Sequence, residues 1–155
     1  MNENELFFRT IQSGNAENLK LQLERDPDLV NITDARGFTP LIFASYFDKE
    51  ELVKILLEYK ADIDGKDASG NTALIGVSFK GNLALVDLLL KHHADINAQN
   101  NNGTTALIYA VQYNQQAVAN ILLDNNADKS LKDSDGKTAL DYAKEKELEA
   151  LLSRL

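Results

Sequence analysis

The sequence predicts an all-α solenoid, a stack of short helix-turn-helix units, and two repeated phrases predict it. A Gly-x-Thr-x-Leu phrase begins at Gly37, Gly70, Gly103 and Gly136, so its copies are 33 residues apart. A Leu-Leu pair followed by Ala-Asp keeps the same step, with the leucines at 56–57, 89–90 and 122–123. A unit of this size cannot bury its apolar face alone. Consecutive units are therefore expected to stack around one continuous core.

Residues 1–33 are predicted to form an N-terminal capping repeat that lacks the Gly-x-Thr phrase. Two short helices flank a turn at Gly14, and their expected apolar residues are Leu6, Phe7, Ile11, Leu19, Leu21 and Leu23. Pro27 prevents the second helix from continuing, because proline fixes φ and lacks an N–H group. A terminal repeat packs against only one neighbour, which accounts for its departure from the repeated phrase.

Residues 34–66 are predicted to form the first full repeat. Gly37 supplies the positive φ of the opening turn. Thr39 is expected to cap the first helix through its hydroxyl, and Pro40 suits the first helical position. The second helix has an apolar stripe at helical spacing, formed by Leu52, Val53, Leu56 and Leu57.

Residues 67–99 and 100–132 restate this pattern, and residues 133–155 form a shortened C-terminal capping repeat with a polar outer face. Gly81 and Asn114 are expected to end the first helices of the two full repeats, because both residue types tolerate left-handed backbone. Val77 stands where the other full repeats have alanine, beside Gly76. We interpret the pair as a local exchange of volume and not as a binding site.

The period and the Gly-x-Thr-Pro/Ala-Leu phrase resemble the ankyrin repeat, a β-turn followed by two antiparallel helices. The resemblance implies an ankyrin-repeat solenoid with β-turn or hairpin fingers, spanning residues 1–155 as one domain. Ankyrin repeats carry histidine after the Thr-Pro-Leu triplet, whereas this chain has Ile42, Ile75, Ile108 and Asp141 there. The Thr-Ala-Leu-Ile sequence resembles the repeats of bacterial ankyrin proteins more than those of animal ones.

Composition excludes several functional classes. A net charge of -8 and a pI near 4.7 disfavour nucleic acid and anionic membrane as partners, because both need a basic surface. With no cysteine, the chain forms neither disulfides nor thiolate metal sites. No signal peptide is visible at the start, so a cytoplasmic monomer is expected, with a secreted effector as the alternative.

The chain shows no constellation typical of catalysis, and no cofactor or metal is expected. The two histidines, His92 and His93, are adjacent and would diverge by about 100° on a helix. We interpret them as a polar helix end, where the helix dipole favours histidine. Asp62, Asp95 and Asp128 recur with the period and belong to the architecture. The chain is therefore predicted not to be an enzyme.

In ankyrin proteins, the turn tips and the exposed sides of the first helices form a concave face that binds another protein. Carried onto this sequence residue by residue, those positions include an unusual number of aromatic side chains. The predicted partner-binding residues are Arg36, Phe38, Tyr46, Phe47, Phe79, Lys80 and Tyr113. Exposed aromatic rings beside basic side chains are typical of interface hot spots.

Three alternatives stay open. Phe47 and Phe79 could instead pack between repeats as core residues. The chain could be a scaffold or an engineered repeat protein without a specific natural partner. An aromatic-lined pocket under Tyr46, Phe79 and Tyr113 could take a peptide or a small molecule. Tyr109 and Tyr142 are interpreted as structural, because their position normally packs between repeats.

Overall fold

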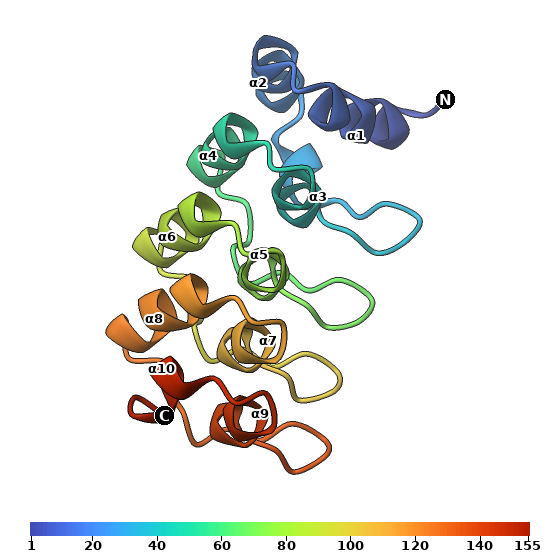
Figure 1. The fold of residues 1–155 in the computed structure, drawn as a ribbon. Coiled ribbons are helices and arrows are strands. Elements are labelled where there is room, and N and C mark those ends of the chain that lie inside the picture. The colour runs from blue at the N-terminus through green and yellow to red at the C-terminus, as the bar shows by residue number, and fades with distance from the viewer.

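The computed structural model describes all residues 1–155, and they form five helix pairs stacked side by side (Figure 1). The first helices of the pairs are α1 (Glu3–Ser13), α3 (Pro40–Tyr46), α5 (Ala73–Lys80), α7 (Ala106–Gln112) and α9 (Ala139–Glu145). The second helices are α2 (Ala16–Arg25), α4 (Glu50–Glu58), α6 (Leu83–Lys91), α8 (Gln116–Asp124) and α10 (Glu149–Leu152), and a short 3-10 helix, η1 (Pro27–Asn31), follows α2. We number the pairs as units 1 to 5 in chain order.

One apolar core runs through the stack. Each first helix packs against the first helix of the next unit, so α5 lies between α3 and α7. The leucine of the repeated phrase is buried in each of three consecutive units, as Leu41, Leu74 and Leu107. Burial of these periodic side chains against their neighbours is the main stabilisation available to helices this short. The all-helical repeat architecture predicted from the sequence is confirmed.

The threonine of each phrase begins a helix. In units 2 to 5 its hydroxyl oxygen accepts a hydrogen bond from the backbone N–H three residues later, as between Thr39 and Ile42 at 3.1 Å. Pro40 occupies the first turn of α3, as predicted. The helices also end as predicted, with positive φ at Gly81 and Asn114.

The finger turns project beside the first helices (Figure 1). They share one hydrogen-bonding arrangement, in which an Asp or Asn side chain binds the backbone of its own turn. Three residues before each phrase glycine stands Asp34, Asp67, Asn100 or Asp133. One side-chain oxygen of each accepts hydrogen bonds from two backbone N–H groups of its own turn. The second oxygen or nitrogen atom of each of these side chains takes no part in these two hydrogen bonds.

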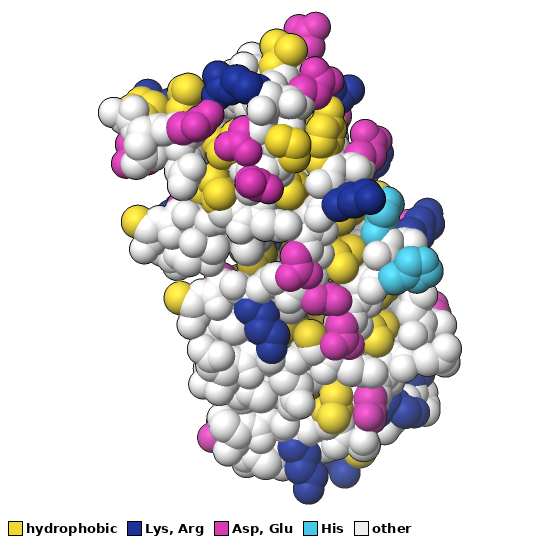
Figure 2. Space-filling view, turned by 180° about the vertical axis from the view of Figure 1, so that it is seen from behind, with side chains coloured by type: hydrophobic (Ala, Val, Ile, Leu, Met, Phe, Trp, Pro, Cys, Tyr) yellow, Lys and Arg dark blue, Asp and Glu magenta, His cyan; other side chains and the backbone are white.

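A ladder of hydrogen bonds joins neighbouring units. The side chains of Asn31, Asp64 and Asn97 accept hydrogen bonds from the backbone N–H groups of Asp62, Asp95 and Asp128, at 2.8 to 2.9 Å. Acidic side chains are distributed along the face shown in Figure 2. The side chain of each of these aspartates accepts a hydrogen bond from the backbone N–H two residues later, at Asp64, Asn97 and Ser130, which gives the three periodic aspartates a structural role, as the sequence predicted.

Two apolar positions of unit 1 differ from the prediction. Leu21 is 63% exposed and Leu6 is 45% exposed, whereas Gln22 and Phe8 are buried. The cause is helical spacing: residues three and four apart share a face, so Gln22 and Leu23 accompany Leu19, and Leu21 points away.

None of the helices combines the length and apolar character that a membrane crossing requires.

Candidate functional site

The predicted partner-binding residues come from three consecutive units. Arg36 and Phe38 lie in the finger turn before α3, and Tyr46 ends that helix with Phe47 as its C-cap. Phe79 and Lys80 end α5, and Tyr113 caps α7. We call Phe38, Tyr46, Phe47, Phe79 and Tyr113 the aromatic row.

The unit 2 part of the row is a cluster of rings. Phe38 and Tyr46 are stacked, with centroids 6.5 Å apart and planes 19° from parallel, and the Arg36 guanidinium lies 4.8 Å from the Phe38 centroid. Tyr46 is 58% exposed. Phe47 is half-buried, with its ring 4.8 Å from that of the core residue Phe43. The Phe47 ring also contacts the Tyr46 ring edge to face, 5.1 Å away, so Phe47 supports Tyr46 more than it offers surface.

A second cluster lies on units 3 and 4. The Phe79 ring contacts Tyr113 at 4.5 Å and Tyr109 at 5.8 Å, both edge to face. Phe79 is 43% exposed and Tyr113 is 49% exposed, so both rings offer surface. Large apolar side chains exposed together in this way commonly mark interaction sites.

Lys80 joins the two clusters. Its ammonium group donates to the backbone carbonyl of Tyr46, pairs with Asp48 at 3.1 Å, and lies 5.0 Å from the Tyr46 centroid. Asp48 also accepts from Asn82 at 2.8 Å; this hydrogen bond and the one from Lys80 hold the pKa of Asp48 below its usual value against the effect of burial. Arg36 is engaged similarly, with Asp34. Both predicted rim cations therefore hold the aromatic side chains in place within the chain.

A hollow of about 350 Å³ separates the two clusters. Phe38 and Tyr46 line one side, Phe79 and Tyr109 line the other, and Gly76 contributes to the lining from the middle of α5. A methyl group added at Gly76 would meet no atom within 4 Å apart from its chain neighbours and the backbone of its own helix. The interpretation of Gly76 and Val77 as an exchange of volume is therefore wrong. Val77 is buried in the core, 1% exposed, and the space at Gly76 stays open.

Tyr109 packs against the core, as predicted from the sequence, and it also lines the hollow. It is half-buried, its hydroxyl accepts from Asn100 Nδ2 at 3.3 Å, and its ring forms a wall of the Gly76 hollow. Tyr113, expected above an aromatic pocket, is not among the lining residues. The wall is instead completed by Phe38 and Lys80.

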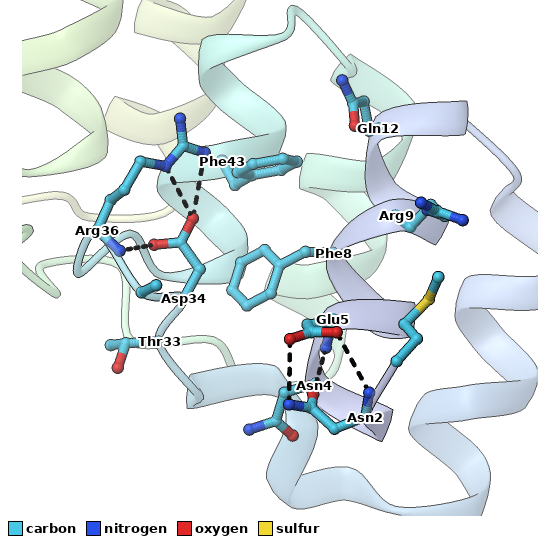
Figure 3. A pocket seen from close by; sticks show the side chains of 12 residues that line it. Asn2, Asn4, Glu5, Phe8, Arg9, Gln12, Thr33, Asp34, Arg36 and Phe43 are labelled. Carbon is cyan, nitrogen blue, oxygen red and sulfur yellow. Dashed lines mark hydrogen bonds and ion pairs between the residues drawn. The ribbon is translucent and has the colours of Figure 1, made fainter.

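A larger but more polar hollow of about 530 Å³ lies between α1 and the first finger turn (Figure 3). Some of its polar groups are paired with one another. Asn2 and Glu5 form the capping box of α1, and Arg36 pairs with Asp34. Phe8 and Phe43 pack edge to face across it, 5.2 Å apart. The other polar lining residues, Asn4, Arg9, Gln12 and Thr33, are exposed to solvent and make no side-chain hydrogen bond within the chain.

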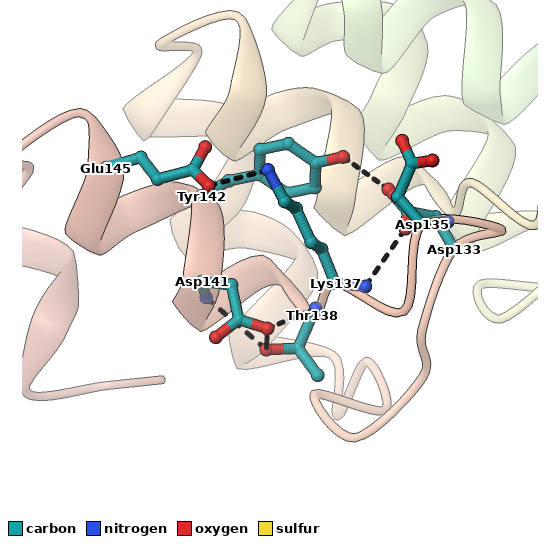
Figure 4. A network of polar contacts seen from close by, with 7 residues as sticks. All are labelled: Asp133, Asp135, Lys137, Thr138, Asp141, Tyr142 and Glu145. Atoms are coloured by element: carbon teal, nitrogen blue, oxygen red, sulfur yellow. Dashed lines mark hydrogen bonds and ion pairs between the residues drawn. The ribbon is translucent and has the colours of Figure 1, made fainter.

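The finger of unit 5 contains a polar network (Figure 4). The Tyr142 hydroxyl donates to Asp133 Oδ2, and Lys137 pairs with Glu145 at 2.6 Å. Burial acts to raise the pKa of Asp133, but hydrogen bonds from Tyr142 and from the backbone of Lys137 and Asp135 lower it overall. The hydrogen bond to Asp133, followed by burial, raises the pKa of Tyr142 well above its usual value. Tyr142 is 7% exposed and is structural, as predicted.

The histidines lie at a helix end. His92 is the C-cap of α6, with Nδ1 2.9 Å from the Leu88 carbonyl oxygen, and His93 has a positive φ. No group of three or more His, Cys, Asp or Glu side chains is placed to hold a metal ion.

A family model described as ankyrin repeats (3 copies) matches residues 7–100 and 75–153, which together cover most of the chain. The chain belongs to the ankyrin-repeat family. Ankyrin repeats generally mediate protein–protein interaction.

Two curated relatives match over short stretches. The human protein named "DNA-binding protein RFXANK" is 51% identical over 49 residues, which is 32% of this chain and 19% of that protein. The zebrafish (Danio rerio) "Ankyrin repeat and SAM domain-containing protein 6" is 35% identical over 57 residues, which is 37% of this chain and 8% of that protein. This ankyrin chain spans less than a fifth of the length of either relative.

Proposed function

We propose that this ankyrin-repeat chain is a non-enzymatic recognition module, which binds another protein through the face formed by its finger turns and first helices. The observation that carries the proposal is the aromatic row, in which Tyr46, Phe79 and Tyr113 are each between 43% and 58% exposed. Central aromatic side chains surrounded by polar groups are the usual source of binding energy in protein interfaces.

The row is well suited to bind without reorganising. Four of its five rings lie at the ends of packed helices, and Lys80 fixes the Tyr46 segment to unit 3 through Tyr46 and Asp48. A surface that is already ordered loses little conformational entropy on binding, which favours affinity. We expect the partner to present a loop or a helix to this surface, with the chain acting as a cytoplasmic monomer.

A protein partner is favoured over nucleic acid. One relative is named as a DNA-binding protein, but the present chain carries a net charge of -8. Binding to nucleic acid draws most of its strength from cationic side chains that neutralise phosphates. Both cations beside the row, Arg36 and Lys80, are already paired with carboxylates.

The test is affinity capture from a lysate of the source organism with three immobilised proteins. These are the wild type, the double variant Tyr46→Ala/Phe79→Ala, and Leu21→Ala as a matched control. Leu21 is an apolar residue on α2 and is 63% exposed, comparable with Tyr46 at 58%. Thermal melts check that all three are folded.

We expect a protein to be captured by the wild type and by Leu21→Ala but lost from the folded double variant. Equal capture by all three would move the binding surface to another face. A double variant that melts far below the wild type would show that these rings stabilise the fold, and single variants of Tyr46 and Tyr113 would then replace it in the capture assay.

A further inference from the structure

The Gly76 hollow has a counterpart in the other units, where an aromatic side chain fills the same place. The residue six positions after the phrase glycine is Phe43 in unit 2, Tyr109 in unit 4 and Tyr142 in unit 5. In unit 3 it is Gly76. The open space over α5 therefore corresponds to one missing aromatic side chain, with Tyr109 of the next unit still present as its wall.

The chain also shows what such a side chain bonds to. In units 4 and 5, the tyrosine hydroxyl meets the side chain that opens the same finger turn: Tyr109 with Asn100 at 3.3 Å, and Tyr142 with Asp133. In unit 2 the aromatic residue is phenylalanine, and Asp34 Oδ2 pairs with Arg36 instead. Each of these three turn residues thus has a partner for its second side-chain atom.

Asp67 of unit 3 lacks that partner. Its Oδ1 accepts from the backbone N–H groups of Ser69 and Asn71, both at 2.9 Å, and no group of the chain donates to its Oδ2. Asp67 is half-buried and lines the Gly76 hollow. A carboxylate oxygen that no group of the chain satisfies is a strong acceptor for an incoming hydroxyl.

From these two observations we propose that the Gly76 hollow binds a tyrosine side chain of the partner protein. The tyrosine ring occupies the space that Tyr109 and Tyr142 fill in their own units, and its hydroxyl donates to Asp67 Oδ2. Phe38 and Tyr46 flank the ring on one side, and Phe79 and Tyr109 on the other. The inference rests on the function proposed above and adds the chemical identity of the anchor residue.

The volume and the lining fit this occupant. At about 350 Å³ the hollow is at the small end of the range for ligand pockets, of the order of 300–1,000 Å³, and suits a side chain better than a cofactor. Aromatic rings favour edge-to-face and offset contacts with an inserted ring. A phenylalanine would leave Asp67 desolvated without a donor, so the site selects tyrosine over phenylalanine.

The test uses p-cresol, the tyrosine side chain as a free molecule, titrated into the ¹⁵N-labelled protein and followed by NMR. We expect saturable shifts of the amide signals of Asp67, Gly76 and Tyr109 at roughly millimolar concentration, as is reasonable for so small a ligand. The comparison ligand, 4-methylanisole, has the same ring but no O–H donor. It is expected to bind about tenfold more weakly, because the bond to a charged acceptor is lost.

Two variants localise the effect. Asp67→Asn keeps an oxygen for the turn, as Asn100 does in unit 4, and is expected to reduce the preference for p-cresol to about twofold or less. Gly76→Tyr fills the hollow from within, so p-cresol should no longer bind and the melting temperature should stay equal or rise. Should Gly76→Tyr fail to fold, Asp67→Asn and the two ligands decide the question without it.

The proposal is overturned if p-cresol produces no saturable shifts at the hollow, binds no better than 4-methylanisole, or binds folded Gly76→Tyr as it binds the wild type. It is also overturned if folded Gly76→Tyr captures the partner as well as the wild type does. In that last case, loss of capture by Tyr46→Ala/Phe79→Ala would leave the proposed function standing, whereas retained capture would overturn both.

Discussion

At the scale of single residues, two glycines of unit 3 have opposite environments. Gly70 has φ 78°, and a Cβ there would lie 2.8 Å from the backbone nitrogen of Asn101 in the next finger. Gly76 lies inside α5 with open space beside it. The turn and the close approach of the next unit require glycine at position 70, whereas packing within the chain gives no reason for glycine at position 76.

Alanine should therefore have opposite effects at the two positions. Gly76→Ala is expected to stabilise the protein by about 0.5–1 kcal/mol, because glycine is unfavourable inside a helix. Gly70→Ala is expected to destabilise it by more than about 1 kcal/mol through left-handed strain and the clash. Urea unfolding of both variants measures the difference. A loss of stability in Gly76→Ala would show that the hollow is closed in solution.

The pair of Tyr142 and Asp133 makes stability depend on pH in two directions. The pKa of Asp133 is lowered on folding, so its contribution is present above the unfolded value of about 3.9 and is lost as the pH falls. The pKa of Tyr142 is raised on folding, so its contribution is present below about pH 10 and is lost as the pH rises.

Tyr142→Phe removes the shared hydrogen bond, whose acceptor is charged, and should cost about 1.5–3 kcal/mol near neutral pH. Melting temperatures of wild type and variant should differ most between about pH 5 and 9 and should converge toward both extremes. A difference that stays constant from acid to alkali would contradict the pairing.

At the scale of the elements, each first helix has only seven or eight residues in units 2 to 5, so its start depends on the threonine cap. A helix of this length is marginal by itself and forms because its cap and its neighbours stabilise it. The cap also sets where the helix begins, and hence which residues end it beside the aromatic row.

Thr105→Ala is expected to destabilise the protein by about 1 kcal/mol, because the N–H of Ile108 loses its acceptor. Thr33→Ala serves as the control, since Thr33 is exposed and caps no helix. Chemical unfolding of both variants measures the two effects, and equal effects would mean that the cap contributes nothing.

At the scale of the whole molecule, stability should decrease toward the ends of the stack. In a repeat protein each unit is stabilised mainly by its neighbours, and a terminal unit has only one. The last helix, α10, has only four residues and no side-chain N-cap. The central helices α5 and α7 are packed on both sides.

Native-state hydrogen exchange should therefore be slowest in α5 and α7 and fastest in α10. Uniform protection along the chain would show that the stack opens as one cooperative unit instead.

Much of the fold could be predicted from the sequence, because the period of 33 residues places the same turn glycine, capping threonine and buried leucine in each repeat. Thr39 as a cap and Gly37 as a left-handed turn residue each follow from their own chemistry and neighbours. Leu21 was placed in the core wrongly, because a two-residue spacing belongs to a strand face and not to a helix face.

The Gly76 hollow could not be predicted in the same way. Adjacent helical residues point about 100° apart, so the larger Val77 does not fill the space beside Gly76. Which side chains of the neighbouring units surround that space is apparent only in three dimensions. One signal was present in the sequence: Asn100 and Tyr109, and likewise Asp133 and Tyr142, are separated by the same interval as Asp67 and Gly76. The interval has meaning only once the hydroxyl contacts are known.

The measurement that tests the account most directly is the dissociation constant of the captured partner for wild type, Phe79→Ala and Leu21→Ala, by isothermal titration calorimetry. The account predicts that Phe79→Ala, which removes an exposed ring beside the hollow, weakens binding by about 2 kcal/mol or more, roughly thirtyfold. Leu21→Ala, on the far helix α2, should leave the constant within about twofold of wild type. Equal affinities for all three folded proteins would contradict the claim that the aromatic row is the recognition surface.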